Sequence, residues 1–106
     1  MKLQVKNNDL YQLYVEINNM QQQFPILYNV CSKKVKEVRK NNDVRYSTLS
    51  DKLNNLQTEF FVIEDKKIKT VEKDGKQSSV FQNNKNFEDY QKKLSEVMNE
   101  PNVIVL

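Results

Sequence analysis

The sequence predicts an α+β fold that is mainly helical, and three observations support this prediction. Apolar residues recur at helical spacing in three stretches, which indicates a short helix, a long helix and a C-terminal helix. β-prone residues occupy both ends of the chain, so we expect a small sheet from terminal strands. An Asp-Gly dipeptide between two strand-like runs predicts a hairpin. A length of 106 residues fits a single small domain, residues 1–106.

The first strand and the first helix follow from the opening residues. Two apolar residues alternate with polar neighbours in Lys2–Lys6, which is typical of a short, half-buried strand. Asp9 and Gln12 have the spacing of a capping box at a helix start. The apolar residues that follow are three or four positions apart: Leu10, Leu13, Tyr14, Ile17 and Met20. We therefore expect the first helix over about residues 9–22.

A longer apolar stripe begins after Phe24-Pro25, a pair that disfavours a continuous helix but suits the start of a new one. The stripe contains Tyr28, Cys31, Val35, Val38, Tyr46, Leu49, Leu53, Leu56 and Phe60, with Leu27 and Val30 on its flank. Asn42 keeps the polar insert Asn41-Asn42-Asp43 in phase with the stripe. This favours one helix over residues 25–61, roughly 55 Å long, over two helices with a break at the insert. Its distal half is expected to pack on the C-terminal helix or on another copy.

The last third of the chain combines a hairpin, a helix and a strand. Residues 68–72 and 77–81 flank Asp74-Gly75 and predict a mostly polar, exposed hairpin. Asn83 to Asn86 supply caps for a third helix, in which Phe87, Tyr90, Leu94, Val97 and Met98 share one face and which Pro101 ends. The final apolar residues predict a strand that pairs with the N-terminal strand or with a neighbouring subunit.

Composition argues against most catalytic chemistry. The chain has no His and one Cys, so His-dependent triads and thiolate metal sites have no residues to build them. Its one Gly lies in the predicted hairpin turn, so no Gly-rich phosphate loop is present. Cys31 lies on the apolar stripe, which favours packing over a nucleophilic role. We expect no catalytic residue, no cofactor and no metal, hence no enzyme.

Two surfaces are candidates for binding. The first is a basic helix stripe that would contact an anion, a nucleotide or a nucleic acid: Lys33, Lys36, Arg39, Lys40 and Arg45. The alternative to anion binding is an ordinary solvent-exposed helix face, on which Lys33 and Glu37 have the spacing of an ion pair. The second is an oligomer interface: Tyr11, Val103, Ile104, Val105 and Leu106. Tyr11 lies off the apolar stripe of its helix, so it is available for an interface. An unpaired apolar strand at the C-terminus would tend to associate with another strand, so a homo-oligomer is expected.

The apolar runs are at most four residues long, which predicts no membrane span and no membrane partner. No signal peptide is expected from the charged start, and the single Cys favours a cytoplasmic location.

The order of several segments resembles a family of short uncharacterised proteins encoded by tailed phages and prophages. The segments are "MKLQVKN", "FPILYNVCSKKVKEV", "EKDGK" and "FEDYQKKLSEVMNEPNVIVL". The resemblance implies an accessory protein that acts in the cytoplasm of an infected bacterial cell. We therefore expect a non-enzymatic, self-associating protein that binds or inhibits a host protein, including one of host defence, or a phage protein. The alternative is a nucleic-acid or nucleotide-binding protein that uses the basic helix stripe.

Overall fold

The computed structural model describes residues 1–106 and confirms the α+β class. The elements in chain order are β1 (Lys2–Lys6), α1 (Asn7–Gln23), α2 (Pro25–Val30), α3 (Ser32–Phe60), β2 (Ile63–Glu64), β3 (Lys67–Ile68), β4 (Thr70–Lys73), β5 (Lys76–Ser79), α4 (Phe87–Met98) and β6 (Pro101–Val105). The chain divides into two compact units. The terminal unit comprises residues 1–50 and 98–106, and the central unit comprises residues 51–97.

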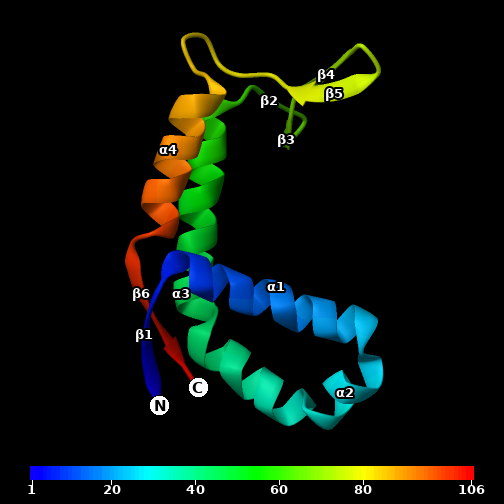
Figure 1. Ribbon diagram of the computed structural model, residues 1–106, viewed down its shortest axis with the longest axis vertical. Coiled ribbons are helices and arrows are strands. Elements are labelled where there is room, and N and C mark those ends of the chain that lie inside the picture. The colour runs from blue at the N-terminus through cyan, green and yellow to red at the C-terminus, as the bar shows by residue number, and fades with distance from the viewer. The chain divides into compact units, whose positions relative to one another are not determined.

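The two ends of the chain pair with each other as predicted. β1 and β6 form an antiparallel two-stranded sheet in which Leu3 lies opposite Ile104, and Figure 1 shows the N- and C-termini at the same end of this sheet. Ile104 is buried. Of the two partners that the sequence leaves open for the last strand, the structure has the N-terminal strand.

The first helix begins earlier than its capping pattern predicts. α1 starts at Asn7, and Asp9 lies in its first turn, where its carboxylate accepts a hydrogen bond from the Lys6 backbone N–H at 3.0 Å. Asn7 is buried and accepts a hydrogen bond from the Asn102 side chain of β6 at 2.6 Å. The start of α1 is therefore fixed by the terminal sheet, which local sequence does not reveal.

The long helix is continuous across the polar insert but does not reach back to Pro25. A turn at Cys31, where φ is −93° and ψ is 5°, separates the six-residue α2 from α3. The prediction of one continuous helix over 25–61 is thus correct from Ser32 to Phe60, whereas residues 25–30 are helical but form the separate helix α2. The first part of α3 belongs to the terminal unit and the last part to the central unit.

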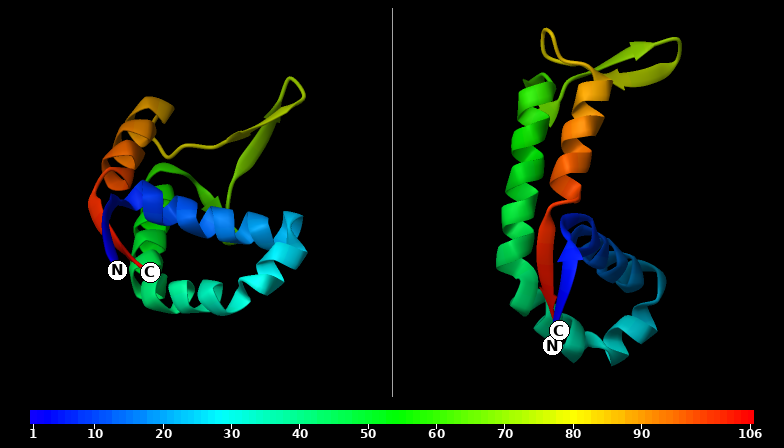
Figure 2. Two further views of the ribbon diagram at one scale, coloured as in Figure 1. Left: turned by 60° about the horizontal axis from the view of Figure 1, so that its bottom comes forward. Right: turned by 60° about the vertical axis from the view of Figure 1, so that its left-hand side comes forward.

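The core of the terminal unit lies between α1, α3 and β6. Its buried apolar members are Leu10, Tyr14, Ile17, Val35, Val38, Leu49 and Ile104. The rings of Tyr14 and Tyr46 stack at 3.9 Å between centroids. Figure 2 shows α2 at the end of this unit that lies away from the terminal strands.

The central unit has its own apolar cluster, in which Leu56, Phe60 and Phe61 are buried. Tyr90 and Leu94 of α4 pack against it, so the distal half of α3 packs on the C-terminal helix, one of the two predicted partners. α4 begins after Asn86, whose side-chain oxygen accepts the Asp89 backbone N–H at 2.9 Å as an N-cap.

Two hairpins complete the central unit. β4 and β5 pair across Asp74-Gly75 as predicted, with Gly75 at φ +77°, and every residue of both strands is exposed. A second hairpin, β2–β3, turns at Asp65 and Lys66, which both have positive φ. Extending the β4–β5 register would place Ile68 opposite Phe81. Because β3 pairs with β2, Ile68 instead lies opposite Ile63.

Candidate functional site

The most unusual surface of the chain is an exposed apolar segment at α2. The exposed fractions are 58% for Phe24, 81% for Ile26, 52% for Leu27 and 78% for Val30. We call these four residues the α2 surface. No residue of α2 is buried. Four large apolar residues left in water within seven positions are uncommon in a small protein, and exposed apolar patches mark interaction sites.

The backbone around α2 explains why these side chains face outward. Phe24, at φ −131° and ψ 62°, ends α1, and Pro25 opens α2 at its first position. Tyr28 and Cys31 are half-buried and continue inward to the buried Val35. Ile26 and Val30 are four positions apart on a different side of the helix, so the inward stripe leaves them in solvent.

The predicted basic stripe is divided by the structure into two sets. Lys33, Lys36 and Lys40 are exposed and form no ion pair. Arg39 donates to the Asn18 side-chain oxygen at 2.9 Å, and Arg45 donates to the Asn41 carbonyl and to the Asn42 side-chain oxygen. Both arginines are half-buried. Of the five residues predicted to contact an anion, the three lysines therefore have free side chains, whereas the two arginines are hydrogen-bonded within the chain.

Ion pairs at helical spacing differ from the sequence prediction. Glu37 lies 3.8 Å from Lys34 rather than pairing with Lys33. Lys93 binds Glu59 of α3 at 2.9 Å, although Asp89 lies four positions before it on its own helix. A contact between two packed helices thus replaces one that the spacing within α4 favours.

A buried tyrosine joins α1 to α3. The Tyr14 hydroxyl donates to the Asp43 carboxylate at 2.7 Å, and burial together with this acceptor raises the pKa of Tyr14 above its ordinary value. The Asp43 side chain and the Tyr46 ring therefore hold Tyr14 in place, and the role of this contact is structural.

The residues predicted for an oligomer interface have different environments. Ile104 is buried, and Val103 and Val105 are half-buried in the terminal sheet of the same chain. Leu106 is exposed, and Tyr11 is 37% exposed on α1. Tyr11 and Leu106 therefore remain accessible, whereas Val103, Ile104 and Val105 are largely covered by other residues of the same chain.

Asn42 has a structural role that the sequence did not reveal. Its side chain is fully buried and binds Val105 twice: Nδ2 donates to the Val105 carbonyl at 2.7 Å, and Oδ1 accepts the Val105 N–H at 2.8 Å. Odd-numbered residues of β1 bond to β6, so the backbone groups of Val105 point to the outer edge of the sheet. The Asn42 side chain supplies the hydrogen-bond partners for this edge. In the sequence, the sign of this role is an Asn in phase with the apolar stripe of α3.

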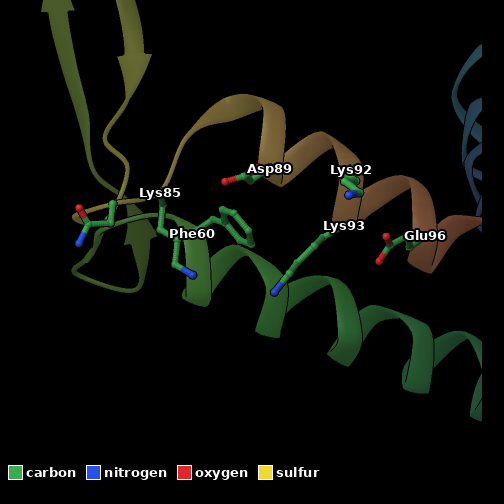
Figure 3. Close-up of a pocket in the computed structure, with 7 residues that line it drawn as sticks. Phe60, Lys85, Asp89, Lys92, Lys93 and Glu96 are labelled. Atoms are coloured by element: carbon green, nitrogen blue, oxygen red, sulfur yellow. The ribbon is translucent and has the colours of Figure 1, made fainter.

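The central unit contains a polar pocket of about 280 Å³ beside Phe60, shown in Figure 3. Lys93 extends from α4 toward α3, and Lys85 and Lys93 lie over the Phe60 ring at 5.0 and 5.5 Å. Both lysines bind Glu59, and the bond from Lys93 holds the pKa of this carboxyl below its ordinary value. Because Asp89 and Glu96 also line the pocket, its charges largely cancel and favour no ligand of one sign.

No three His, Cys, Asp or Glu side chains gather into a group that could hold a metal ion. None of the four helices has the length and apolar character needed to cross a bilayer. No protein-family model matches the chain, and no curated protein or solved structure is significantly similar to it. Function is therefore inferred from the surfaces of this chain alone, and the α2 surface is the candidate site.

Proposed function

We propose that this chain is a non-enzymatic interaction protein that binds another protein through the α2 surface. The observation that carries the proposal is the exposure of Phe24, just before α2, and of Ile26, Leu27 and Val30 on α2, none of whose residues is buried. Covering the exposed parts of these side chains would contribute about 4–8 kcal/mol before the costs of association. That gain suits a reversible partner that covers the segment when bound.

The biological setting of the proposal comes from the resemblance to short phage and prophage proteins. On this view the chain is an accessory protein in the cytoplasm of an infected cell, where it binds or inhibits a host protein, including one of host defence, or a phage protein. The exposed apolar segment supports binding to a protein.

Self-association is a second part of the proposal and uses the terminal sheet. Leu3, Leu106 and Tyr11 are exposed apolar or aromatic residues of the terminal unit, outside α2. The outer edge of β1 carries Lys2 and Lys6, charges that oppose edge-to-edge strand pairing. A second copy would therefore contact these side chains rather than extend the sheet.

The proposal is tested by comparing matched surface variants. The double variant Ile26→Ser/Val30→Ser removes the most exposed part of the α2 surface, and Val44→Ser removes an equally exposed apolar residue, at 80%, from α3. Proteins retained by the wild type from infected-cell extract are identified by mass spectrometry, purified and titrated by calorimetry. A partner should bind the wild type and Val44→Ser alike and lose at least ten-fold in affinity for the double variant. Equal binding by all three proteins would refute the proposed surface.

The alternative function is binding of a nucleic acid or nucleotide, and the free lysines Lys33, Lys36 and Lys40 favour it. They lie on the side of α3 opposite to its buried stripe. Three phosphate contacts on duplex DNA predict a log-log salt dependence with a slope of about −2.7. This alternative requires binding at low salt that the triple substitution of these lysines by Gln abolishes.

A further inference from the structure

We propose that the partner segment is an acidic amphipathic helix, which lies along the α2 surface and across the lysines that follow it on α3. This inference rests on the proposed function and adds the chemistry of the partner. It combines two features that adjoin each other in the structure: the exposed apolar residues of α2, and the unpaired positive charges of the first turns of α3.

The exposed apolar residues of α2 and the free lysines of α3 follow one another along the chain, and we call this run, from Ile26 to Lys40, the line. The two helices meet at Cys31, whose N–H donates to the Leu27 carbonyl and whose carbonyl accepts the Val35 N–H, each at 3.0 Å. Ile26 and Val30 are four positions apart and share one face of α2. Lys33 follows directly after the turn, as the second residue of α3.

The charge of this line is positive and unneutralised. Lys33, Lys36 and Lys40 are exposed and have no ion pair, and the one carboxylate among them, Glu37, is paired with Lys34. An approaching segment with Asp or Glu would gain complementary charge along this stretch and would be steered toward it. A neutral apolar segment would contact only the α2 surface.

The length of the line determines the size of the partner segment. On α3, Lys33 to Lys40 span about 10 Å at 1.5 Å per residue, or about two helical turns, and on α2 Ile26 and Val30 are one turn apart. A partner helix of about 14 residues would match these turns and the one between them, with an apolar turn over Ile26 and Val30 and acidic residues over the lysines. Partner helices are recognised through anchors one turn apart along such a segment.

Two other occupants fit the same surface less well. A second copy would bring the same lysines, so a parallel pair would place like charges together and an antiparallel pair would gain no ion pair. A helix that lies on an anionic bilayer carries its basic residues on the polar face, opposite its apolar face. Here the apolar residues lie on α2 and the basic residues follow on α3, one set after the other along the chain, which suits a rod-shaped partner.

The test uses a display library of helical 18-residue peptides with randomised surface positions, selected on the full-length protein. The expected result is enrichment of peptides with one apolar turn followed by Asp and Glu. The enriched peptide is synthesised with a fluorescent label, together with a copy in which every acidic residue is replaced by its amide. Anisotropy at low and high salt should show the acidic peptide binding at least ten-fold more tightly than the amide copy, with the difference shrinking as salt rises.

Matched protein variants locate the bound peptide. Lys33→Glu/Lys36→Glu should weaken the acidic peptide at least ten-fold and should bind a peptide with Lys in place of the acidic residues, which the wild type rejects. Lys73→Glu/Lys76→Glu, an equal charge change on the exposed hairpin β4–β5, should leave affinity unchanged. Ile26→Ser/Val30→Ser should also weaken binding. Circular dichroism confirms that each variant is folded.

Several outcomes would overturn the inference. These are enrichment of no acidic pattern, equal binding of the amide copy, binding that survives Ile26→Ser/Val30→Ser, a dimer in light scattering that this double variant abolishes, or binding of phosphatidylserine vesicles without binding of peptides. The proposed function has a separate readout. If a natural partner depends on Ile26 and Val30 but competes with no acidic peptide, the inference fails and the proposed function stands.

Discussion

Replacing Asn42 by Leu tests how the ends of the chain are held. Asn42 is fully buried, and its side chain makes two hydrogen bonds to the Val105 backbone and a third to the Val38 carbonyl. Leu has the same number and branching of side-chain heavy atoms but no polar atom, so the outward N–H and C=O of Val105 would lose their partners. Asn41→Leu is the matched control, because Asn41 is the exposed neighbour on the same helix and both substitutions change helix propensity equally.

The expected difference between the two variants follows from the hydrogen bonds to Val105. Two lost bonds cost about 1 kcal/mol each, and leaving a buried group unsatisfied adds to this, so Asn42→Leu should be about 2–4 kcal/mol less stable than Asn41→Leu. Urea unfolding followed by circular dichroism gives the free energies, and hydrogen exchange at the Val105 amide should accelerate only in Asn42→Leu. A difference below about 1 kcal/mol, with Val105 still protected, would refute this role of Asn42.

Three further predictions concern contacts in both units. Tyr14→Phe should cost about 1.5 kcal/mol at neutral pH through the lost bond to Asp43. Because the folded state raises the pKa of Tyr14, the stability that depends on this group is complete below about pH 10 and is lost as pH rises above it. Urea unfolding at a series of alkaline pH values should show a weaker loss of stability in the variant than in the wild type. The same dependence of unfolding free energy on pH in both proteins would contradict the contact. Phe61→Ala should cost about 3–5 kcal/mol because Phe61 is buried against Phe81 and Tyr90, whereas Val71→Ala on exposed β4 should stay within about 0.5 kcal/mol; comparable urea midpoints would refute this packing. Glu59→Gln should leave the midpoint nearly unchanged in high salt, because its lysine contacts are solvent-exposed, and should remove only the loss of stability that follows as acid protonates Glu59; a large shift at neutral pH would contradict this.

The elements that the sequence predicts correctly are those with a strong local pattern. The Asp74-Gly75 hairpin, the Asn86 cap and the apolar stripe of α3 each depend on residues close in the chain. A strand at the C-terminal end was predictable because its residues are mostly β-branched, whereas the choice of the N-terminal strand over a neighbouring subunit as its partner came from the structure.

The features that the sequence misses depend on contacts between distant segments. The start of α1 depends on Asn102, the β2–β3 turn adopts positive φ without Gly, and the turn at Cys31 interrupts an apolar stripe that is otherwise in phase. Such choices are decided by tertiary packing, which overrides local preference.

The candidate site was only partly predictable for the same reason. Lys33, Lys36 and Lys40 are exposed as a helical stripe predicts, but Arg39 and Arg45 are engaged by partners that spacing alone does not identify. The α2 surface was interpreted as part of a packed stripe and its flank. Only the structure shows that Ile26, Leu27 and Val30 remain in solvent.

Site-specific photo-crosslinking tests the central claim most directly, because the chain offers two positions of equal exposure. A benzophenone amino acid is placed at Ile26 in one protein and at Val44 in another; these residues are 81% and 80% exposed. In cells that contain the partner, irradiation should join a second protein to position 26 and leave position 44 without a product. A product at position 44 alone, or equal products at both positions, would contradict docking at the α2 surface.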